Sequence, residues 1–213
     1  MNRLIEWLPS LWEATLTTLW VASVAAVLAT ALGALILVLL LVDFKPLTVV
    51  LRVFISIFRN TPLLVQIFFI FYGLPLLGIN LGPATSGILA ITLNEGAFIA
   101  EILRGSSRGI SKGEIDAANS LGLSKWKRIS LVYFPLSFRA GIPAVTGQWS
   151  IVLKDTSLLS FVMIFELSRA GNQFYANYFD NTAIWIVAVI YVLLFGLFTL
   201  VGKTLERRLK VRR

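Results

Sequence analysis

The chain contains 213 residues, of which 57% are apolar and only 14% are charged, and its net charge is +8. Soluble domains are typically ~45–50% apolar and ~25% charged, so this composition excludes an ordinary soluble enzyme. The sequence has no cysteine and no histidine, which excludes disulfides, thiolate or imidazole metal sites and serine–histidine or cysteine catalysis. These numbers indicate an integral membrane protein.

Five stretches are apolar enough to form membrane-spanning helices, each of which needs ~20 mainly apolar residues. The predicted spans cover 14–42, 53–74, 84–103, 140–165 and 181–202. The second and third come from one long uncharged stretch, which we divide at its prolines and glycines between residues 75 and 83. These stretches lack the strict alternation of apolar and polar residues that membrane β-barrel strands show, so the pattern favours helices over a β-barrel. The predicted fold is all-α, with one transmembrane domain over residues 1–213.

The orientation in the membrane is predicted from the basic residues. Sixteen of the 19 Lys and Arg residues fall on one side of the five-span arrangement: Lys45, Arg52, Arg59, Arg104, Arg108, Lys112, Lys125, Lys127, Arg128, Arg139, Lys203, Arg207, Arg208, Lys210, Arg212 and Arg213. Cytoplasmic loops carry such an excess, so we expect the N-terminus outside and the C-terminus inside. The net charge is then mostly a topological signal, and we expect no nucleic-acid partner.

The segment 105–139, between the third and fourth spans, is the only long polar segment. Ser111 and Glu114 have the spacing of a helix capping box, and Gly122 fits the left-handed position after a short helix. Ser124 can cap a second helix that leads back into the membrane. On these residues alone, the segment is either a helix that docks in a partner's groove or a surface loop with helical propensity.

Four blocks of this sequence resemble one family. The residues Asp116-Ala117-Ala118, then Gly122, then Val132-x-Phe134-Pro135 have the spacing of the EAA loop of ABC importer permeases. Three further blocks resemble the polar amino-acid uptake branch of this family: Arg59–Pro75, Ala100–Gly105 and Lys154–Leu158. This branch includes histidine, glutamine and arginine permeases. The resemblance covers about residues 15–208, with Asp116 standing where the family pattern has Glu.

The resemblance implies the transmembrane subunit of a type I ABC importer in a prokaryotic inner membrane. Its expected partners are a second permease subunit (the same or a similar chain), a dimer of cytoplasmic ATPases, and an external binding protein that delivers an amino acid. The EAA loop would bind the ATPases through Glu114, Asp116, Ala117, Ala118, Gly122 and Leu123. The chain itself would be no enzyme and would hold no cofactor, because ATP and Mg²⁺ would bind to the ATPase subunits.

Charged residues inside spans are costly and are therefore candidates for function. Glu101 and Arg104 lie three residues apart on a helix and are expected to pair. Glu95 and Asp155 are predicted at similar depths in the membrane, where both can face one cavity. Together with Asn94 and Gln148 they form the predicted substrate pathway. An alternative left open is an ion pair between Lys154 and Glu95 that holds the helices together.

Two other functions fit parts of the sequence. A proton-coupled secondary amino-acid transporter would use Glu95 and Asp155 as a proton relay, but such transporters usually contain internal repeats, and none is evident here. A membrane scaffold that binds a partner through segment 105–139 would leave the charges inside the spans unexplained. The amino-acid permease therefore accounts for more of the sequence.

Overall fold

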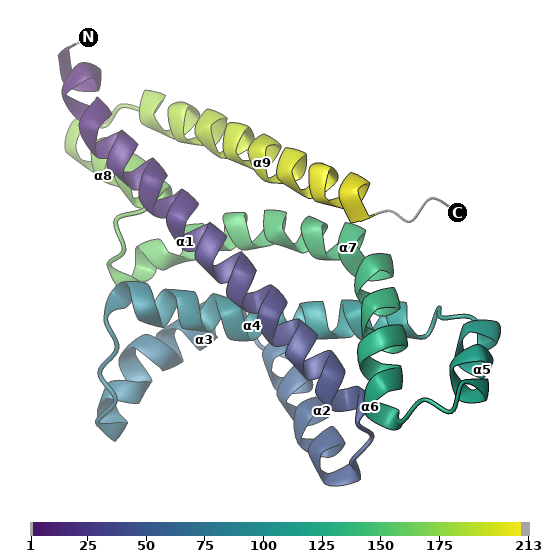
Figure 1. Ribbon diagram of the computed structural model, residues 1–213. Helices are drawn as coiled ribbons and strands as arrows, with labels where there is room; N and C mark the ends of the chain where they lie inside the picture. Colours follow the sequence, from purple (N-terminus) through teal and green to yellow (C-terminus); the bar gives the residue numbers. More distant parts are fainter. Residues whose placement is uncertain (1, 210–213) are drawn as a thin grey trace.

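The computed structural model describes residues 2–209, and every regular element in this range is a helix (Figure 1). The α-helices are α1 (Asn2–Leu41), α2 (Lys45–Asn60), α3 (Leu63–Phe68), α4 (Pro83–Ser107), α5 (Lys112–Ser120), α6 (Lys125–Arg128), α7 (Phe134–Asp155), α8 (Leu167–Tyr178) and α9 (Thr182–Leu209). Short π or 3₁₀ segments extend some of them: η1 (Phe69–Gly73), η2 (Leu74–Leu77), η3 (Ile129–Tyr133) and η4 (Thr156–Val162). The all-α prediction is confirmed.

Four helical segments are long and apolar enough to cross a membrane: Arg3–Leu41, Pro83–Ser107, Lys125–Val162 and Thr182–Leu209. A further candidate consists of α2 and the helical segment Leu63–Leu77, which is bent by 108° relative to α2. Counting this bent pair as one span gives the five spans expected from the sequence.

The second span differs from the predicted range 53–74, because it is broken at Pro62. α2 ends at Asn60, Thr61 is extended (φ −111°, ψ 143°), and the next helix begins after Pro62. Proline has no N–H group and its ring collides with the carbonyl four residues earlier in a continuing helix, and it also favours an extended conformation for the residue before it. The break therefore lies earlier in the chain than the prolines and glycines between residues 75 and 83, at which the sequence pattern divides this region.

The fourth span begins earlier than the predicted residue 140. α6, η3 and α7 form one helical segment from Lys125 to Asp155, which η4 extends. Pro135 lacks the N–H group that would bond to Leu131, and the π turn of η3 lies directly before α7, where such irregular turns accommodate a missing bond. The connection between α4 and α6 is therefore shorter than the predicted loop 105–139, and it consists mainly of α5.

α4 is the central helix of the bundle. In its 18-residue apolar stretch, 67% is buried inside the protein, compared with 17% for the corresponding stretch of α9. α1 crosses α4 at close range (Figure 1). A Cβ atom added to Gly33 of α1 would lie 2.5 Å from the Ile99 side chain of α4, so only glycine permits this approach. α7 is attached to α1 by the Trp149 indole N–H, which donates to the Thr30 hydroxyl at 2.9 Å.

α5 projects away from the spans (Figure 1) and begins with the predicted capping box. The Ser111 hydroxyl accepts a hydrogen bond from the Glu114 N–H at 3.3 Å, and the Glu114 carboxylate accepts from the Ser111 N–H at 3.0 Å. Ser124 occupies the N-cap position of α6, as predicted, but its side chain makes no capping hydrogen bond.

α5 ends in a Schellman motif built on Gly122. The residue is left-handed (φ 63°), its N–H donates to the Asn119 carbonyl at 3.0 Å, and the Leu123 N–H donates to the Ala118 carbonyl at 3.4 Å. These two bonds satisfy carbonyls that the end of a helix otherwise leaves unpaired. The left-handed turn predicted at Gly122 is present.

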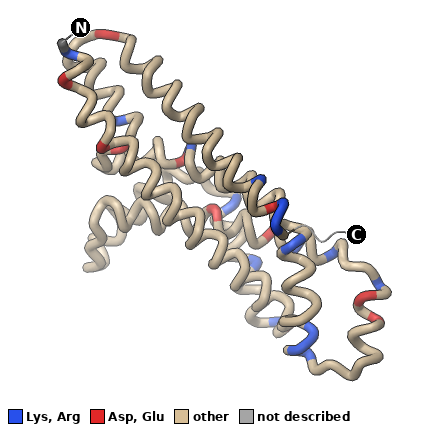
Figure 2. Tube along the Cα trace, turned by 45° about the horizontal axis from the view of Figure 1, so that its top comes forward, with Lys and Arg blue, Asp and Glu red and all other residues tan. Residues whose placement is uncertain are grey.

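Basic residues gather toward the end of the molecule that carries α5, α6 and the last turns of α9 (Figure 2). The other end contains α8 and the beginning of α1, where the Arg3 guanidinium lies 5.0 Å from the centre of the Tyr178 ring. Lys210, Arg212 and Arg213, which belong to the orientation prediction, lie outside the described residues. The charge asymmetry between the two ends is the basis of the orientation prediction.

Candidate substrate site and coupling loop

Three of the four predicted pathway residues meet between α4 and α7. Glu95 is 2% exposed, and its carboxylate accepts a hydrogen bond of 2.5 Å from the Gln148 side-chain amide. The Asp155 carboxyl also interacts directly with the Glu95 carboxyl. Gln148 and Asp155 are seven residues apart on α7, so both lie on one face of that helix. An acidic, partly open polar site thus occupies the interior of the spans.

Lys154 does not pair with Glu95. Its ammonium lies 5.1 Å from the centre of the Phe195 ring on α9, in cation–π geometry. Both salt bridges found among the described residues involve Glu101, so the alternative ion pair considered for Lys154 is not formed there. Lys154 instead lines two cavities between α7 and α9, of about 510 Å³ and 310 Å³, that also share Phe195.

Asn94, the fourth predicted pathway residue, is turned toward α2 and α3. It is 5% exposed, and its side-chain amide donates to the Phe58 carbonyl at 2.7 Å and to the Gln66 side-chain oxygen at 3.2 Å. Successive residues of a helix point about 100° apart, which explains why Asn94 and its neighbour Glu95 contact different helices.

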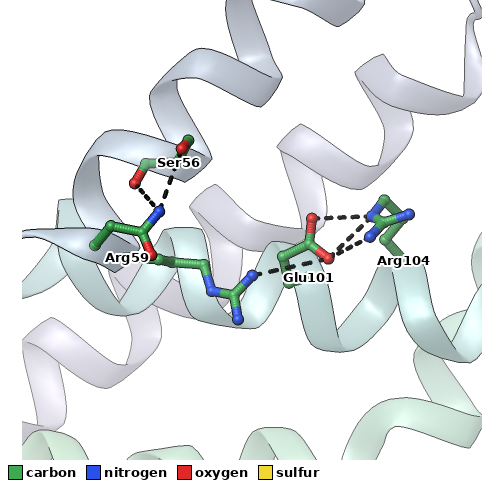
Figure 3. A network of polar contacts seen from close by, with 5 residues as sticks. Ser56, Arg59, Glu101 and Arg104 are labelled. Atoms are coloured by element: carbon green, nitrogen blue, oxygen red, sulfur yellow. Dashed lines mark hydrogen bonds and ion pairs between the residues drawn. The ribbon is translucent and has the colours of Figure 1, made fainter.

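Glu101 and Arg104 form the predicted pair near the end of α4. The Arg104 guanidinium donates to the Glu101 carboxylate from Nε at 2.9 Å and from Nη2 at 2.5 Å. A second arginine, Arg59 of α2, approaches the same carboxylate from the other side at 4.0 Å (Figure 3). The sequence identified the local pair but not the third member, because Arg59 comes from another span.

A buried carboxylate that the sequence analysis did not consider lies at the beginning of α8. Glu166 is 1% exposed and accepts hydrogen bonds from the N–H groups of Ser168 and Arg169, at 2.8 and 2.7 Å, and from the Tyr191 hydroxyl at 2.9 Å. It was missed because it directly follows the fourth predicted span, which ends at residue 165. The pattern Glu-x-Ser-Arg before an amphipathic helix was the available signal, since an acidic residue before a helix often caps it.

The predicted ATPase-coupling residues all lie on α5 or in the turn that follows it. Asp116 and Ala117 are exposed, Ala118 is buried, and Leu123 is partly buried. Glu114 belongs to the capping box at the start of the helix. The set therefore includes residues that build the helix and its turn as well as residues on its open surface.

These features define a class of protein: a multi-pass membrane protein with polar and charged groups held between its spans, an arrangement typical of transport proteins. Over residues 2–209 the side chains contain no group of three acidic residues that could hold a metal ion.

Comparison with known proteins identifies the family within this class. The family model described as "Binding-protein-dependent transport system inner membrane component" matches residues 40–211. The chain is 40% identical over 162 residues to the glutamine transport system permease protein GlnP of Escherichia coli (strain K12), covering 75% of this chain and 74% of GlnP. It is 36% identical over 167 residues to the L-cystine transport system permease protein TcyB of Bacillus subtilis (strain 168), covering 78% and 71%.

A solved structure, described as the crystal structure of an amino acid ABC transporter with histidines, superposes with a TM-score of 0.86 over 96% of both chains at 26% identity. The present chain belongs to the family of binding-protein-dependent transport system inner membrane components. It is a multi-pass permease subunit of an ABC importer in an inner membrane, not an enzyme. Membership confirms the resemblance seen in the sequence and favours it over the secondary transporter.

Proposed function

We propose that this chain carries a polar amino acid across the inner membrane, and that the acidic site of Glu95, Gln148 and Asp155 contacts the amino acid on its way. The observation that carries the proposal is the meeting of two carboxyl groups and an amide between α4 and α7. Relatives with names that specify glutamine, L-cystine and arginine transport support an amino-acid cargo.

The chemistry of the site fits the ammonium group of an amino acid. Carboxyl groups inside a membrane need a positive or hydrogen-bonding partner, and a passing ammonium supplies one. Lys154 lines a different cavity, of about 510 Å³, between α7 and α9. The acidic site is therefore suited to the ammonium end of the amino acid. Asn94 belongs to the proposed pathway as the neighbour of Glu95 on α4, with its side chain bonded to Phe58 and Gln66.

Energy would come from partner subunits. In the proposed complex, a dimer of cytoplasmic ATPases, which bind ATP and Mg²⁺, docks on the α5 helices of this chain and of a second permease subunit, the same or a similar chain. An external binding protein delivers the amino acid. The projecting position of α5 and its small exposed residues Asp116 and Ala117 support such docking, because small side chains let a helix seat closely in a groove.

The direct test is transport. The chain, purified with its ATPase and reconstituted in lipid vesicles with the binding protein, is expected to show ATP-dependent uptake of one or a few labelled amino acids from a panel of all twenty. Uptake that proceeds without ATP but follows a proton gradient would contradict the proposal and favour the secondary transporter.

Asp155→Asn tests the site itself. The change keeps the shape of the side chain but removes its charge, and one charge-assisted contact contributes ~1.5–3 kcal/mol, so we expect uptake to fall roughly ten- to hundredfold. ATPase binding should be intact. Asp43→Asn is the matched control: Asp43 is exposed in a left-handed turn, which Asn adopts equally well, so uptake should be normal. Normal uptake in Asp155→Asn would remove this residue from the pathway.

A further inference from the structure

At the break in the second span, the backbone carbonyl of Phe58 has no helical partner. In a continuous helix the Phe58 carbonyl would accept a hydrogen bond from residue 62, but Pro62 has no N–H group. Because a membrane interior offers little water to such a carbonyl, the chain must supply another donor. A break inside a span therefore needs a specific partner.

Two buried side-chain amides supply that donor. Gln66, on the far side of the break in α3, donates to the Phe58 carbonyl at 2.9 Å and to the Thr61 carbonyl and hydroxyl at 3.1 and 2.7 Å. Asn94, on α4, donates to the Phe58 carbonyl at 2.7 Å and to the Gln66 side-chain oxygen at 3.2 Å. We call these two side chains the amide brace. It joins both arms of the bent span to α4.

The same face of α4 holds the end of α2 at two further points. Phe98 and Glu101 follow Asn94 at four and seven residues, which places all three on one side of the helix. The Arg59 guanidinium, next to Phe58 in sequence, lies 5.1 Å from the centre of the Phe98 ring and 4.0 Å from the Glu101 carboxylate (Figure 3). α4 thus contacts the last turn of α2 immediately before the break.

The contacts between α4 and the end of α2 differ in burial and in length. Arg59 and Glu101 are partly open to solvent, with 39% and 22% of their side chains exposed, and Glu101 is held at shorter range by Arg104. The amide brace is buried and makes five hydrogen bonds of 3.2 Å or less. The brace is therefore the part of the contact that fixes the bend.

The brace also lies directly beside the proposed substrate site. Asn94 and Glu95 are neighbours on α4, and Glu95 contacts Gln148 of α7. Any shift of α4 at Asn94 displaces the Glu95 carboxylate by a similar amount. The bend of the second span and the position of the acidic site are therefore linked through two adjacent residues.

We propose that Asn94 and Gln66 are positioning residues for transport: they hold the bend at Pro62 and thereby fix the place of Glu95, without contacting the substrate. This inference rests on the proposed function for the role of Glu95. The bend itself is measurable in the absence of any substrate, so failure of the brace and failure of the amino-acid assignment are distinguishable.

The experiment measures the bend by spin labels. The chain has no cysteine, so cysteines introduced at the exposed positions Val50 of α2 and Leu76 of η2 are the only labelling sites. At ~1.5 Å per residue these positions are roughly 39 Å apart along a straight helix and roughly 22 Å apart when the helix axis turns by 108° at the break. The label distance is read in the complete transporter, in lipid, together with ATP-dependent uptake.

Asn94→Asp and Gln66→Glu each replace the donating NH₂ group by an oxygen of nearly the same size. We expect both to broaden the label distances toward larger values and to lower uptake at least tenfold. Asn60→Asp is the matched control, because Asn60 caps the Ser56 carbonyl at the same helix end but is exposed and contacts no other helix through this bond. It should leave the label distance at its wild-type value and change uptake by less than about twofold.

If the Asn94 and Gln66 variants fail to insert into the membrane, Pro62→Ala tests the role of the Phe58 carbonyl in another way. It restores an N–H group for the Phe58 carbonyl, so we expect label distances near the straight value and a comparable loss of uptake. Loss of uptake in Asn94→Asp with unchanged distances would overturn the proposal and make Asn94 a substrate contact. Changed distances with normal uptake, or no change in either, would overturn it as well.

Discussion

Glu166 is a carboxylate in an environment that opposes its charge. Burial raises the pKa of Glu166, and the hydrogen bonds from Ser168, Arg169 and Tyr191 only partly offset this effect. A carboxyl with a pKa higher in the folded than in the unfolded state stabilises the fold when it is protonated. That contribution is complete below the unfolded pKa and is lost as the pH rises through the folded pKa.

We therefore predict a pH-dependent stability that depends on Glu166. One pKa unit corresponds to about 1.4 kcal/mol, and about 1 kcal/mol shifts the Tm of a chain of this size by roughly 2–4 °C. Thermal unfolding of the purified protein should show Tm falling as the pH rises above about 4.5, more steeply than in Glu166→Gln. Glu13→Gln, at an exposed position on α1, should retain the wild-type slope. Equal slopes in all three proteins would contradict this account.

Among elements, α5 shows how a short helix is made independent of its surroundings. It has a capping box at its start and a Schellman motif at its end, so the hydrogen bonds at both ends come from within the loop. The shape of the proposed ATPase-docking element is therefore encoded locally, and a single backbone position can disturb it.

Gly122→Val is the corresponding test. A β-branched residue in the left-handed conformation is strained by ~1–2 kcal/mol, so the turn after α5 should open. We expect normal insertion but at least a tenfold loss of ATP-dependent uptake, with weaker copurification of the ATPase. Gly105→Val is the control, since Gly105 is exposed in the last turn of α4, has no atom within 4 Å of an added Cβ, and has no positive φ. Full coupling in Gly122→Val would remove the docking role of this turn.

The comparison of α5 with the second span shows what a sequence reveals about an element. Ser111, Glu114 and Gly122 act on neighbours within a few residues, so their pattern was sufficient to predict the caps and the turn. The break at Pro62 depends on Asn94, a residue of another span, to satisfy the Phe58 carbonyl. A proline in an apolar run predicts a weak point, but whether the helix continues is decided by such distant partners.

The residues of the candidate substrate site were also predictable only in part, because some of their contacts depend on one helix alone and others on how several helices pack. Depth along each helix predicted that Glu95, Gln148 and Asp155 lie together, because rise per residue is constant. The direction in which Asn94 points, and the approach of Arg59 to Glu101, depend on how the helices are rotated about their axes. That rotation is set by packing, including the close crossing at Gly33, which no pattern within one helix specifies.

At the scale of the whole molecule, the two ends differ in charge and in construction. One end carries the beginning of α1 and α8, which meet at Arg3 and Tyr178. The other carries α5, α6 and the end of α9, and the Glu206 carboxylate there accepts a hydrogen bond of 2.7 Å from Thr146 of α7. Lys and Arg gather at this second end (Figure 2). The excess predicts that the α5 end faces the cytoplasm, where an ATPase can reach it.

Accessibility of single cysteines tests this orientation, and the absence of native cysteine makes the measurement clean. Lys112→Cys places a thiol on the exposed start of α5, and Asn177→Cys places one on the exposed surface of α8. In right-side-out membrane vesicles, a membrane-impermeant maleimide should label Asn177→Cys at least tenfold faster than Lys112→Cys, because the bilayer separates the reagent from the basic end. Opening the vesicles with detergent should make the two rates similar, which controls for intrinsic reactivity. Rapid labelling of Lys112→Cys in sealed vesicles would reverse the topology and would place α5 where no cytoplasmic ATPase can dock.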